Sequence, residues 1–230
     1  MARPPWKRPG VVLAAAGVYA GSTAFAYLTF VEPKGASELE DMSDARRVQV
    51  FNSNAAKYDK VAAGTGRNLP FYAADAQLTL TDVSAGMLQQ IPGKAAAAGR
   101  QVDASELREM SASALAFSDE SFDTVVDTFG LCSMDDSVAA LEEMQRVCKR
   151  RGGRVLLLEH GRSHYAWLSR LLDKFAPQHA QRWGCHWNRD ILALVAAAGL
   201  EVETVRRFHF GTTYYIVARP RGAGALRSDE

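Results

Sequence analysis

In Val61-Ala62-Ala63-Gly64-Thr65-Gly66-Arg67-Asn68, small residues form a loop that the sequence places before a helix, and an acid, Asp82, follows it. Glycines at such a bend let the backbone come within van der Waals distance of a ligand. An acid at the end of the next strand can accept hydrogen bonds from a ribose. The loop and the acid together therefore indicate a cofactor that carries adenosine.

The residues before this loop do not form the strand that such a loop requires. An apolar strand should lead into the glycines, but they follow Ala55-Ala56-Lys57-Tyr58-Asp59-Lys60, which has no strand pattern. We therefore expect the central sheet to lack this strand, and the backbone groups of its neighbours to lose their partners. A missing exon or a faulty gene model between Lys60 and Val61 would produce the same sequence.

Composition favours one globular domain with a short appendage, because the 230 residues are 47% hydrophobic and 23% charged. The net charge of +1 gives no electrostatic argument for a polyanionic partner, so nucleic acid is not favoured. The sequence does not predict an oligomeric state.

The three cysteines, Cys132, Cys148 and Cys185, are far apart and odd in number. They suggest neither a disulfide framework nor a metal site with two closely spaced cysteines, and we expect two thiols in the core and one nearer a pocket. Cys185 and His186 are adjacent, and no second pair has ligand spacing, so we predict no metal. Cys185 and His186, with Trp183 and Trp187, are instead candidates for a lid over an apolar substrate.

Residues 11–31 contain no charge, and about 20 apolar residues suffice to cross a bilayer as a helix. We expect an uncleaved transmembrane helix here, with a secretory signal peptide and a mitochondrial presequence as the rival interpretations. Basic residues before the span favour an amino terminus on the cytoplasmic or matrix side, whereas the supply of the cofactor argues for the opposite orientation. The membrane topology therefore stays open.

The rest of the chain alternates between helical and strand patterns. Such alternation indicates a parallel sheet with helices on both faces, and two closing strands joined at Gly211 indicate an antiparallel hairpin. Asn188 is the expected cap of the last helix, and the aromatic group Phe208, Phe210, Tyr214 and Tyr215 is expected in the sheet core. Helices are expected at 38–60, 69–76, 84–98, 137–149, 165–175 and 189–198, and strands at 77–81, 122–129, 154–159, 201–210 and 212–218, with a weak strand pattern within 99–110.

From Val61 to Pro220 the chain resembles the class I S-adenosylmethionine-dependent methyltransferases of the methyltransferase 11 type. Gly64-Thr65-Gly66 is similar to the glycine motif of that family, and Asp82 to its ribose-binding acid. The segment Ser121-Phe122-Asp123-Thr124-Val125-Val126 is similar to the lead into its fourth strand. Arg146-Val147-Cys148-Lys149-Arg150-Arg151-Gly152-Gly153 resembles the turn before its fifth strand. The resemblance implies an α/β fold: a Rossmann-like methyltransferase sheet with a carboxyl-terminal antiparallel hairpin, whose first strand is missing or degraded here.

Other segments resemble a membrane-anchored subgroup of that family, the fungal mitochondrial Oms-type proteins and the animal thiol methyltransferase-like proteins. They are Gly130-Leu131-Cys132-Ser133, Leu158-Glu159-His160-Gly161 and Trp183-Gly184-Cys185. The subgroup implies a single-pass membrane protein, in the mitochondrial inner membrane or alternatively the endoplasmic reticulum. The domains that follow are a basic segment at 1–10, a transmembrane helix at 11–31, a linker and helix at 32–60, a methyltransferase domain at 61–220 and a disordered tail at 221–230.

The resemblance also implies which residues hold S-adenosylmethionine. Gly64 and Gly66 would admit the amino acid part of the cofactor, and Asp82 would bind the ribose hydroxyls. Ser111 and Ala112 would lie beside the adenine, where the family commonly has an acid. The implied cofactor-binding residues are Ala63, Gly64, Gly66, Asp82, Ser111, Ala112 and Thr128.

The implied catalytic residues are Asp127 and His160. Asp127 and Thr128, at the exit of the fourth strand, would face the methyl group, and His160 is the candidate base because imidazole titrates near neutral pH. Each assignment has a structural alternative. His160 is equally compatible with a hydrogen-bonded loop histidine, and Asp82 with a cap for the helix that begins near Ser84.

Three functions remain open. The first is a membrane-anchored methyltransferase that acts on a small hydrophobic acceptor, such as a quinol or a thiol. The second is a catalytically inactive or truncated protein that serves as a scaffold or assembly factor in a membrane. A dinucleotide-dependent oxidoreductase is disfavoured, because position 69 is Leu where the dinucleotide fingerprint has a third glycine.

Overall fold

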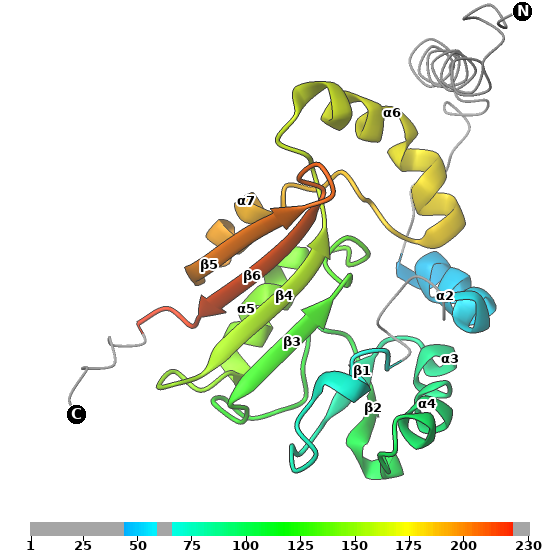
Figure 1. Cartoon of the computed structure of the whole chain (residues 1–230), viewed down its shortest axis with the longest axis vertical. Helices are drawn as coiled ribbons and strands as arrows, with labels where there is room; N and C mark the ends of the chain where they lie inside the picture. The colour runs from blue at the N-terminus through cyan, green and yellow to red at the C-terminus, as the bar shows by residue number, and fades with distance from the viewer. Residues whose placement is uncertain (1–43, 59–65, 223–230) are drawn as a thin grey trace, which may run out of the picture. The chain divides into compact units, whose positions relative to one another are not determined.

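A computed structural model of the chain describes residues 44–58 and 66–222 (Figure 1). Residues Leu39–Glu230 form one compact unit, and the unit Met1–Glu38 lies outside the described part. The expected transmembrane helix at 11–31 and the residues Ala63 and Gly64 also fall outside it. None of the described helices combines the length and hydrophobicity that a membrane crossing requires.

The main sheet has four strands in the order β3-β4-β6-β5. Strand β3 (Thr124–Thr128) runs parallel to β4 (Arg154–His160), whereas β6 (Thr213–Arg219) is antiparallel to both β4 and β5 (Glu201–Phe208). The expected closing hairpin and the parallel pair before it are therefore confirmed. The expected helix at 38–60 corresponds to α2 (Asp44–Tyr58).

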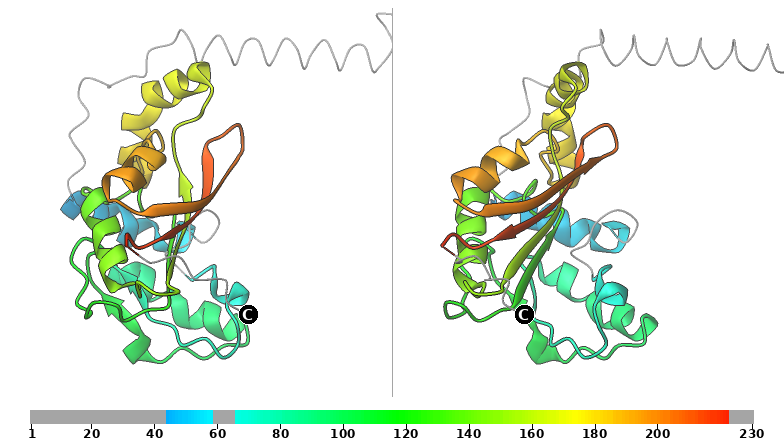
Figure 2. Two further views of the ribbon diagram at one scale, coloured as in Figure 1. Left: turned by 90° about the vertical axis from the view of Figure 1, so that its left-hand side faces the viewer. Right: turned by 60° about the vertical axis from the view of Figure 1, so that its left-hand side comes forward.

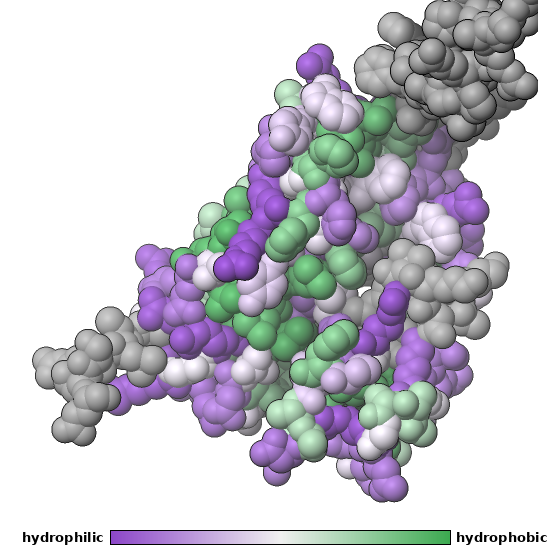
Figure 3. Space-filling model, in the orientation of Figure 1, coloured by the Kyte–Doolittle hydropathy of each residue, from purple (hydrophilic) through white to green (hydrophobic). Residues whose placement is uncertain are grey.

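One face of this sheet packs on helices, and no described helix covers the other, so the expected parallel sheet with helices on both faces is not found in the described residues. Along β4, Val155 and Leu157 alternate with half-buried residues and pack with Ile191 of α7 (Ile191–Ala197), while α5 (Ser137–Val147) covers the same face (Figure 2). On the opposite face Val126 is 39% exposed, and Figure 3 shows apolar side chains gathered there. The burial alternates with a period of two, as a sheet covered on one side requires.

A second, smaller sheet consists of β1 (Leu80–Asp82) and β2 (Leu107–Glu109), which run parallel. No described strand joins β1 to β3, so the two sheets are separate in the described part of the chain. This is the position at which the sequence predicted a missing strand. Around the small sheet lie the 3-10 turns η2 (Leu69–Phe71) and η3 (Ala104–Glu106) and the helices α3 (Ala85–Leu88) and α4 (Ile91–Ala97).

Helix α2 is fastened to the small sheet and to the loop after β3. The Oδ1 atom of Asn52 accepts hydrogen bonds from Ser84 Oγ at 2.6 Å and from the backbone N–H of Gly86 at 3.0 Å. The buried Arg47 forms an ion pair with Asp135. These contacts tie α2 to both walls of the space between the two sheets.

Two expectations about helices are wrong. Residues 69–76 were expected to form a helix, but only the turn η2 forms, with Pro70 in its first positions, and Tyr72 is extended. The last helix is capped by Asp190, whose side chain accepts the backbone N–H of Ala193 at 3.1 Å. Asn188 instead donates to Asp173 at 2.9 Å.

Helix α6 (Ala166–Trp183) is longer than the expected 165–175 and contains Pro177. The aromatic group expected in the sheet core is mostly at the surface. Only Tyr214 is buried, whereas Phe210 is 72% exposed, because it lies in the turn beyond β5.

Candidate functional site

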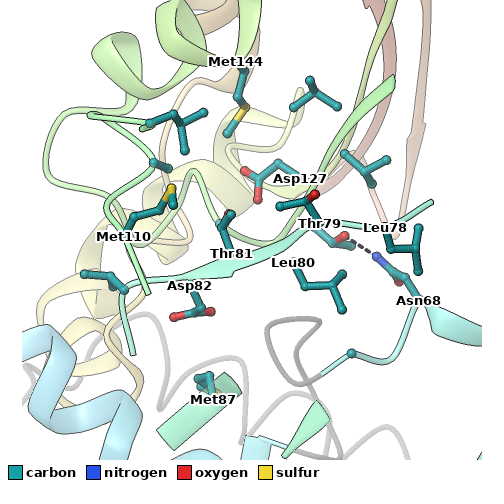
Figure 4. A pocket seen from close by; sticks show the side chains of 18 of the residues that line it. Asn68, Leu78, Thr79, Leu80, Thr81, Asp82, Met87, Met110, Asp127 and Met144 are labelled. Atoms are coloured by element: carbon teal, nitrogen blue, oxygen red, sulfur yellow. Dashed lines mark hydrogen bonds between the residues drawn. The ribbon is translucent and has the colours of Figure 1, made fainter. Parts of the chain in front are cut away.

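A cavity of about 960 Å³ lies between the two sheets. Residues 77–83 form one wall and residues 121–130 form the other, with Gly66 and Asn68 also among the lining residues. Figure 4 shows Asp82 and Asp127 on the two strands that flank the cavity. Both strands contribute their carboxyl ends, where open α/β sheets bind their ligands.

Asp82 ends β1 and lines the cavity. Its Oδ1 atom accepts the backbone N–H of Ser84 at 2.8 Å. Burial raises the pKa of the Asp82 carboxyl to about 6, the hydrogen bond from Ser84 opposes this, and the charge of Asp127 adds to it. The cap of helix α3 is Ser84, which accepts from the N–H of Met87 at 3.2 Å, so the capping alternative for Asp82 does not apply.

Ser111 and Ala112 line the cavity just after β2. The register of the small sheet sets Glu109 opposite Asp82, so these residues follow directly on the neighbouring strand. The side-chain oxygen of Ser111 accepts the N–H of Ser113 at 3.3 Å, which fixes the turn. The structure therefore brings the two predicted adenine-side residues to the same wall as Asp82.

The carboxyl end of β3 forms the opposite wall. The amide nitrogen of Asn68 donates to Thr128 Oγ1 at 2.6 Å, which ties the start of η2 to this wall. Phe129 has a φ of +58°, a left-handed conformation that costs a non-glycine residue free energy and often marks functional turns. A Cβ atom at Gly130 would come within 2.3 Å of the carboxyl of Asp127, so the turn requires glycine there.

Two acids meet at this turn, Asp127 and Glu159. Glu159 is fully buried, and burial raises the pKa of its carboxyl well above the usual range; burial also raises the pKa of Asp127. Two carboxylates offer each other only hydrogen-bond acceptors, whereas one shared proton turns their contact into a hydrogen bond. The raised pKa values of both carboxyls favour a proton shared between them at the cavity wall.

His160, the predicted base, is not among the described residues that line the cavity. It ends β4, and its ring packs on Phe129 with centroids 4.1 Å apart. One nitrogen of its ring lies within 4.8 Å of the Sγ atoms of Cys132 and Cys185. The structure thus places His160 beside two cysteines and outside the described lining of the cavity.

Most of the predicted cofactor residues share one site. Sequence reasoning missed Asn68, although it directly follows the glycine loop, and Glu159, because a buried acid inside an apolar strand gives no signal of its own. It also missed the Cys132–Cys185 contact, since 52 residues separate the two cysteines. The predicted residues that line the cavity are Gly66, Asp82, Ser111, Ala112, Asp127 and Thr128.

Comparison with known proteins gives a consistent result. Residues 60–157 match the family described as a methyltransferase domain. The chain is 33% identical, over 179 residues, to the mitochondrial methyltransferase OMS1 of Saccharomyces cerevisiae, an alignment that covers 71% of this chain and 38% of that protein. It is 37% identical, over 109 residues, to a phosphatidylethanolamine N-methyltransferase of Cereibacter sphaeroides. That alignment covers 47% of this chain and 53% of the relative. The chain thus spans between about a third and about half of these relatives.

Solved structures share the fold. An S-adenosylmethionine-dependent methyltransferase of Thermotoga maritima superimposes with a TM-score of 0.55 at 17% identity, over 75% of this chain and 99% of that one. A protein of Pyrococcus horikoshii superimposes with a TM-score of 0.54 at 16% identity, over 88% of this chain and 99% of that one. The fold is therefore the Rossmann-like methyltransferase fold, and with the family match it implies S-adenosylmethionine as the cofactor.

Proposed function

We propose that this chain transfers a methyl group from S-adenosylmethionine to a small hydrophobic acceptor, a quinol or a thiol, because residues 60–157 match the methyltransferase-domain family. One observation carries the proposal. Asp82, Ser111 and Asp127, which come from three separate segments, line a single cavity.

The residues present fit the cofactor. The carboxylate of Asp82 accepts the backbone N–H groups of Ser84 and Val83, and its remaining acceptor positions can take the two hydroxyls of a ribose. Buried Asp127 Oδ2 has no hydrogen-bond donor in the described part of the chain. Gly66 has a φ of +86°, and a side chain there would press on Leu69. We expect Asp82 to hold the ribose, and Ser111 and Ala112 to lie by the adenine.

S-adenosylmethionine supplies a methyl group bonded to a sulfonium sulfur. A nucleophile aligned opposite the carbon–sulfur bond takes this methyl group readily. The protein must therefore orient the acceptor, exclude water and take up the acceptor's proton. We assign the acceptor's proton to Asp127, which is the ionised member of the pair when Glu159, whose pKa is raised well above its usual range, carries the shared proton. His160 stays a candidate base, but it would have to act from outside the described cavity lining.

The character of the cavity favours an apolar acceptor. Its lining includes several aliphatic and thioether side chains, and methionine adapts its shape to varied apolar ligands. The phosphatidylethanolamine enzyme among the relatives makes an amine lipid the acceptor to test beside a quinol and a thiol. The apolar lining residues include Leu78, Leu80, Met87, Met110 and Met144 (Figure 4).

We further propose that residues 11–31 anchor the chain in a membrane, and that this membrane is mitochondrial. The charge-free sequence of these residues supports the first part, and the name of the yeast relative supports the second. Imaging a tagged full-length chain against mitochondrial and endoplasmic reticulum markers, followed by carbonate extraction, tests both parts.

A catalytically inactive scaffold is the competing function. The observation that favours it is the separation of the two sheets, because the edges of β1 and β3 then lack strand partners in the described part of the chain. A distorted cofactor site would follow from the loss of those partners.

The experiment that decides is a transfer assay on the full chain in lipid nanodiscs. Methyl-labelled S-adenosylmethionine is offered with a quinol, an alkyl thiol or an ethanolamine lipid, and labelled product is extracted. At a limiting concentration of S-adenosylmethionine, Asp82→Asn should strongly reduce labelling, whereas Glu109→Gln, an exposed residue paired with Asp82 in the sheet register, should not. If a well-folded chain labels none of the three acceptors and binds no cofactor, the methyltransferase proposal is wrong and the scaffold function is favoured.

A further inference from the structure

Three residues with metal-binding side chains meet outside the cofactor cavity. Cys132 lies in the loop after β3, His160 ends β4, and Cys185 follows the end of helix α6. One donor atom from each, the two Sγ atoms and an imidazole nitrogen, lie within 4.8 Å of one another. Cys132 is 1% exposed and Cys185 is 8% exposed, so water competes little for the site.

The backbone holds the two cysteine loops together independently of the sulfur atoms. The N–H of His186 donates to the carbonyl of Cys132 at 2.7 Å, and the guanidinium of Arg189 donates to the carbonyl of Leu131 at 2.8 Å. Gly184 turns the chain with a φ of +71°, and a Cβ atom there would meet Phe51 at 2.8 Å. The sulfur atoms are therefore brought together by a frame that other contacts define.

The two cysteine sulfur atoms are in direct contact. The two Sγ atoms are 2.7 Å apart, closer than two thiols in simple contact, yet longer than the 2.03–2.05 Å of a disulfide. A disulfide would join the two sulfur atoms but would not involve the imidazole of His160. A tetrahedral zinc ion, with Zn–S bonds of about 2.3 Å, would set the sulfurs about 3.8 Å apart, which small side-chain rotations can reach.

We propose that Cys132, His160 and Cys185 bind a zinc ion, with the fourth coordination position open. Two sulfur donors and one imidazole nitrogen form a donor set that zinc uses in proteins. Each thiol releases one proton as its sulfur binds the ion, and the neutral imidazole of His160 binds through a nitrogen lone pair. The site does not depend on methyl transfer, and it differs from the expectation in the sequence analysis that the chain holds no metal.

Bound zinc would tie the loop after β3, the end of β4 and the end of α6 to one point. Phe129, whose ring packs on His160, lies between this point and Thr128 of the cavity wall. The nitrogen of His160 that binds zinc is then not available as a base, so the proton role stays with Asp127.

The test measures zinc on the full chain purified in detergent under reducing conditions. The protein is dialysed against zinc alone, then against buffer, and bound zinc is counted by mass spectrometry. We expect one zinc ion per chain, its loss in Cys185→Ser, and its retention in Cys148→Ser. Cys148 is a matched control because it is also buried but packs in the core between α5 and β4.

Replacing zinc with cobalt gives a second readout that needs no variant. Thiolate ligands produce a sulfur-to-cobalt charge-transfer band, so this band in the unaltered chain supports the site even if the serine variants fail to fold. Zinc no higher in the unaltered chain than in Cys185→Ser would overturn the proposal, as would cobalt binding without that band. A thiol count of one after denaturation without reductant, in place of three, would assign the pair to a disulfide instead.

Discussion

The affinity for S-adenosylmethionine should depend on pH through Asp82. A carboxylate accepts hydrogen bonds from both ribose hydroxyls, whereas a protonated carboxyl must give up one acceptor position. Burial raises the pKa of Asp82 to about 6 in the free protein. The binding-competent, ionised form is therefore depleted within an experimentally convenient pH range.

The magnitude follows from the ionised fraction. With a pKa of about 6, Asp82 is about nine-tenths ionised at pH 7 and about one-tenth ionised at pH 5. The apparent dissociation constant rises as the competent fraction falls, so binding should weaken about tenfold between pH 7 and pH 5. Above pH 7 the affinity should be nearly constant.

Asp82→Asn isolates this effect. The amide keeps the shape of the side chain but removes the charge, and hydrogen bonds to charged groups are worth about 1.5–3 kcal/mol, so affinity at pH 7 should fall about 10- to 150-fold. The variant should also lose the pH dependence below pH 7. Glu109→Gln, on the facing strand, should bind as the unaltered chain does.

Isothermal titration of the three proteins with S-adenosylmethionine at pH 5, 6, 7 and 8 measures all of these values. Tight, pH-dependent binding by Asp82→Asn would refute the assignment, because the titrating group would then be another one. Asp127 is the first alternative in that case, since its carboxyl faces the same cavity.

Four further variants test the fold and the acid pair. Leu157→Ala should cost about 2–5 kcal/mol in urea unfolding, because Leu157 is 1% exposed, and Leu158→Ala on the open face should cost clearly less. Asp127→Asn should raise the free energy of unfolding at pH 8 and not at pH 4. The reason is that an acid with a raised pKa destabilises the folded state only at a pH where the acid must ionise. An equal increase in the free energy of unfolding at pH 4 and pH 8 would contradict the shared proton with Glu159. Ser84→Ala should cost about 0.5–2 kcal/mol by loss of the α3 cap, and an unchanged urea midpoint would show that the cap contributes nothing.

The parts of the fold that the sequence predicts have strong periodicity and clear ends. The helix at 137–149 and the strand at 154–159 are confirmed as α5 and β4, because apolar spacing and a glycine stop define them. The helix expected at 69–76 fails, since Pro70 and the hydrogen bond of Asn68 to Thr128 hold that segment in a turn. Long-range contacts of that kind leave no trace in local sequence.

The candidate site also has a part that the sequence predicts and a part that it does not. Asp82 is predictable because its place after a strand fixes both its position and its environment. The Asp127–Glu159 pair and the group of Cys132, His160 and Cys185 are not, because parallel pairing of β3 with β4 and the return of the chain after α6 bring them together. Spacing rules for metal sites detect ligands on one loop, and here each ligand comes from a different element.

Hydrogen exchange with and without S-adenosylmethionine tests most directly whether the cavity between β1 and β3 is the cofactor site. Exchange should slow together at residues 80–83, 110–113 and 127–130, which come from three separate segments of that cavity. Protection confined to one of these segments, or found only at residues outside the cavity, would contradict the site.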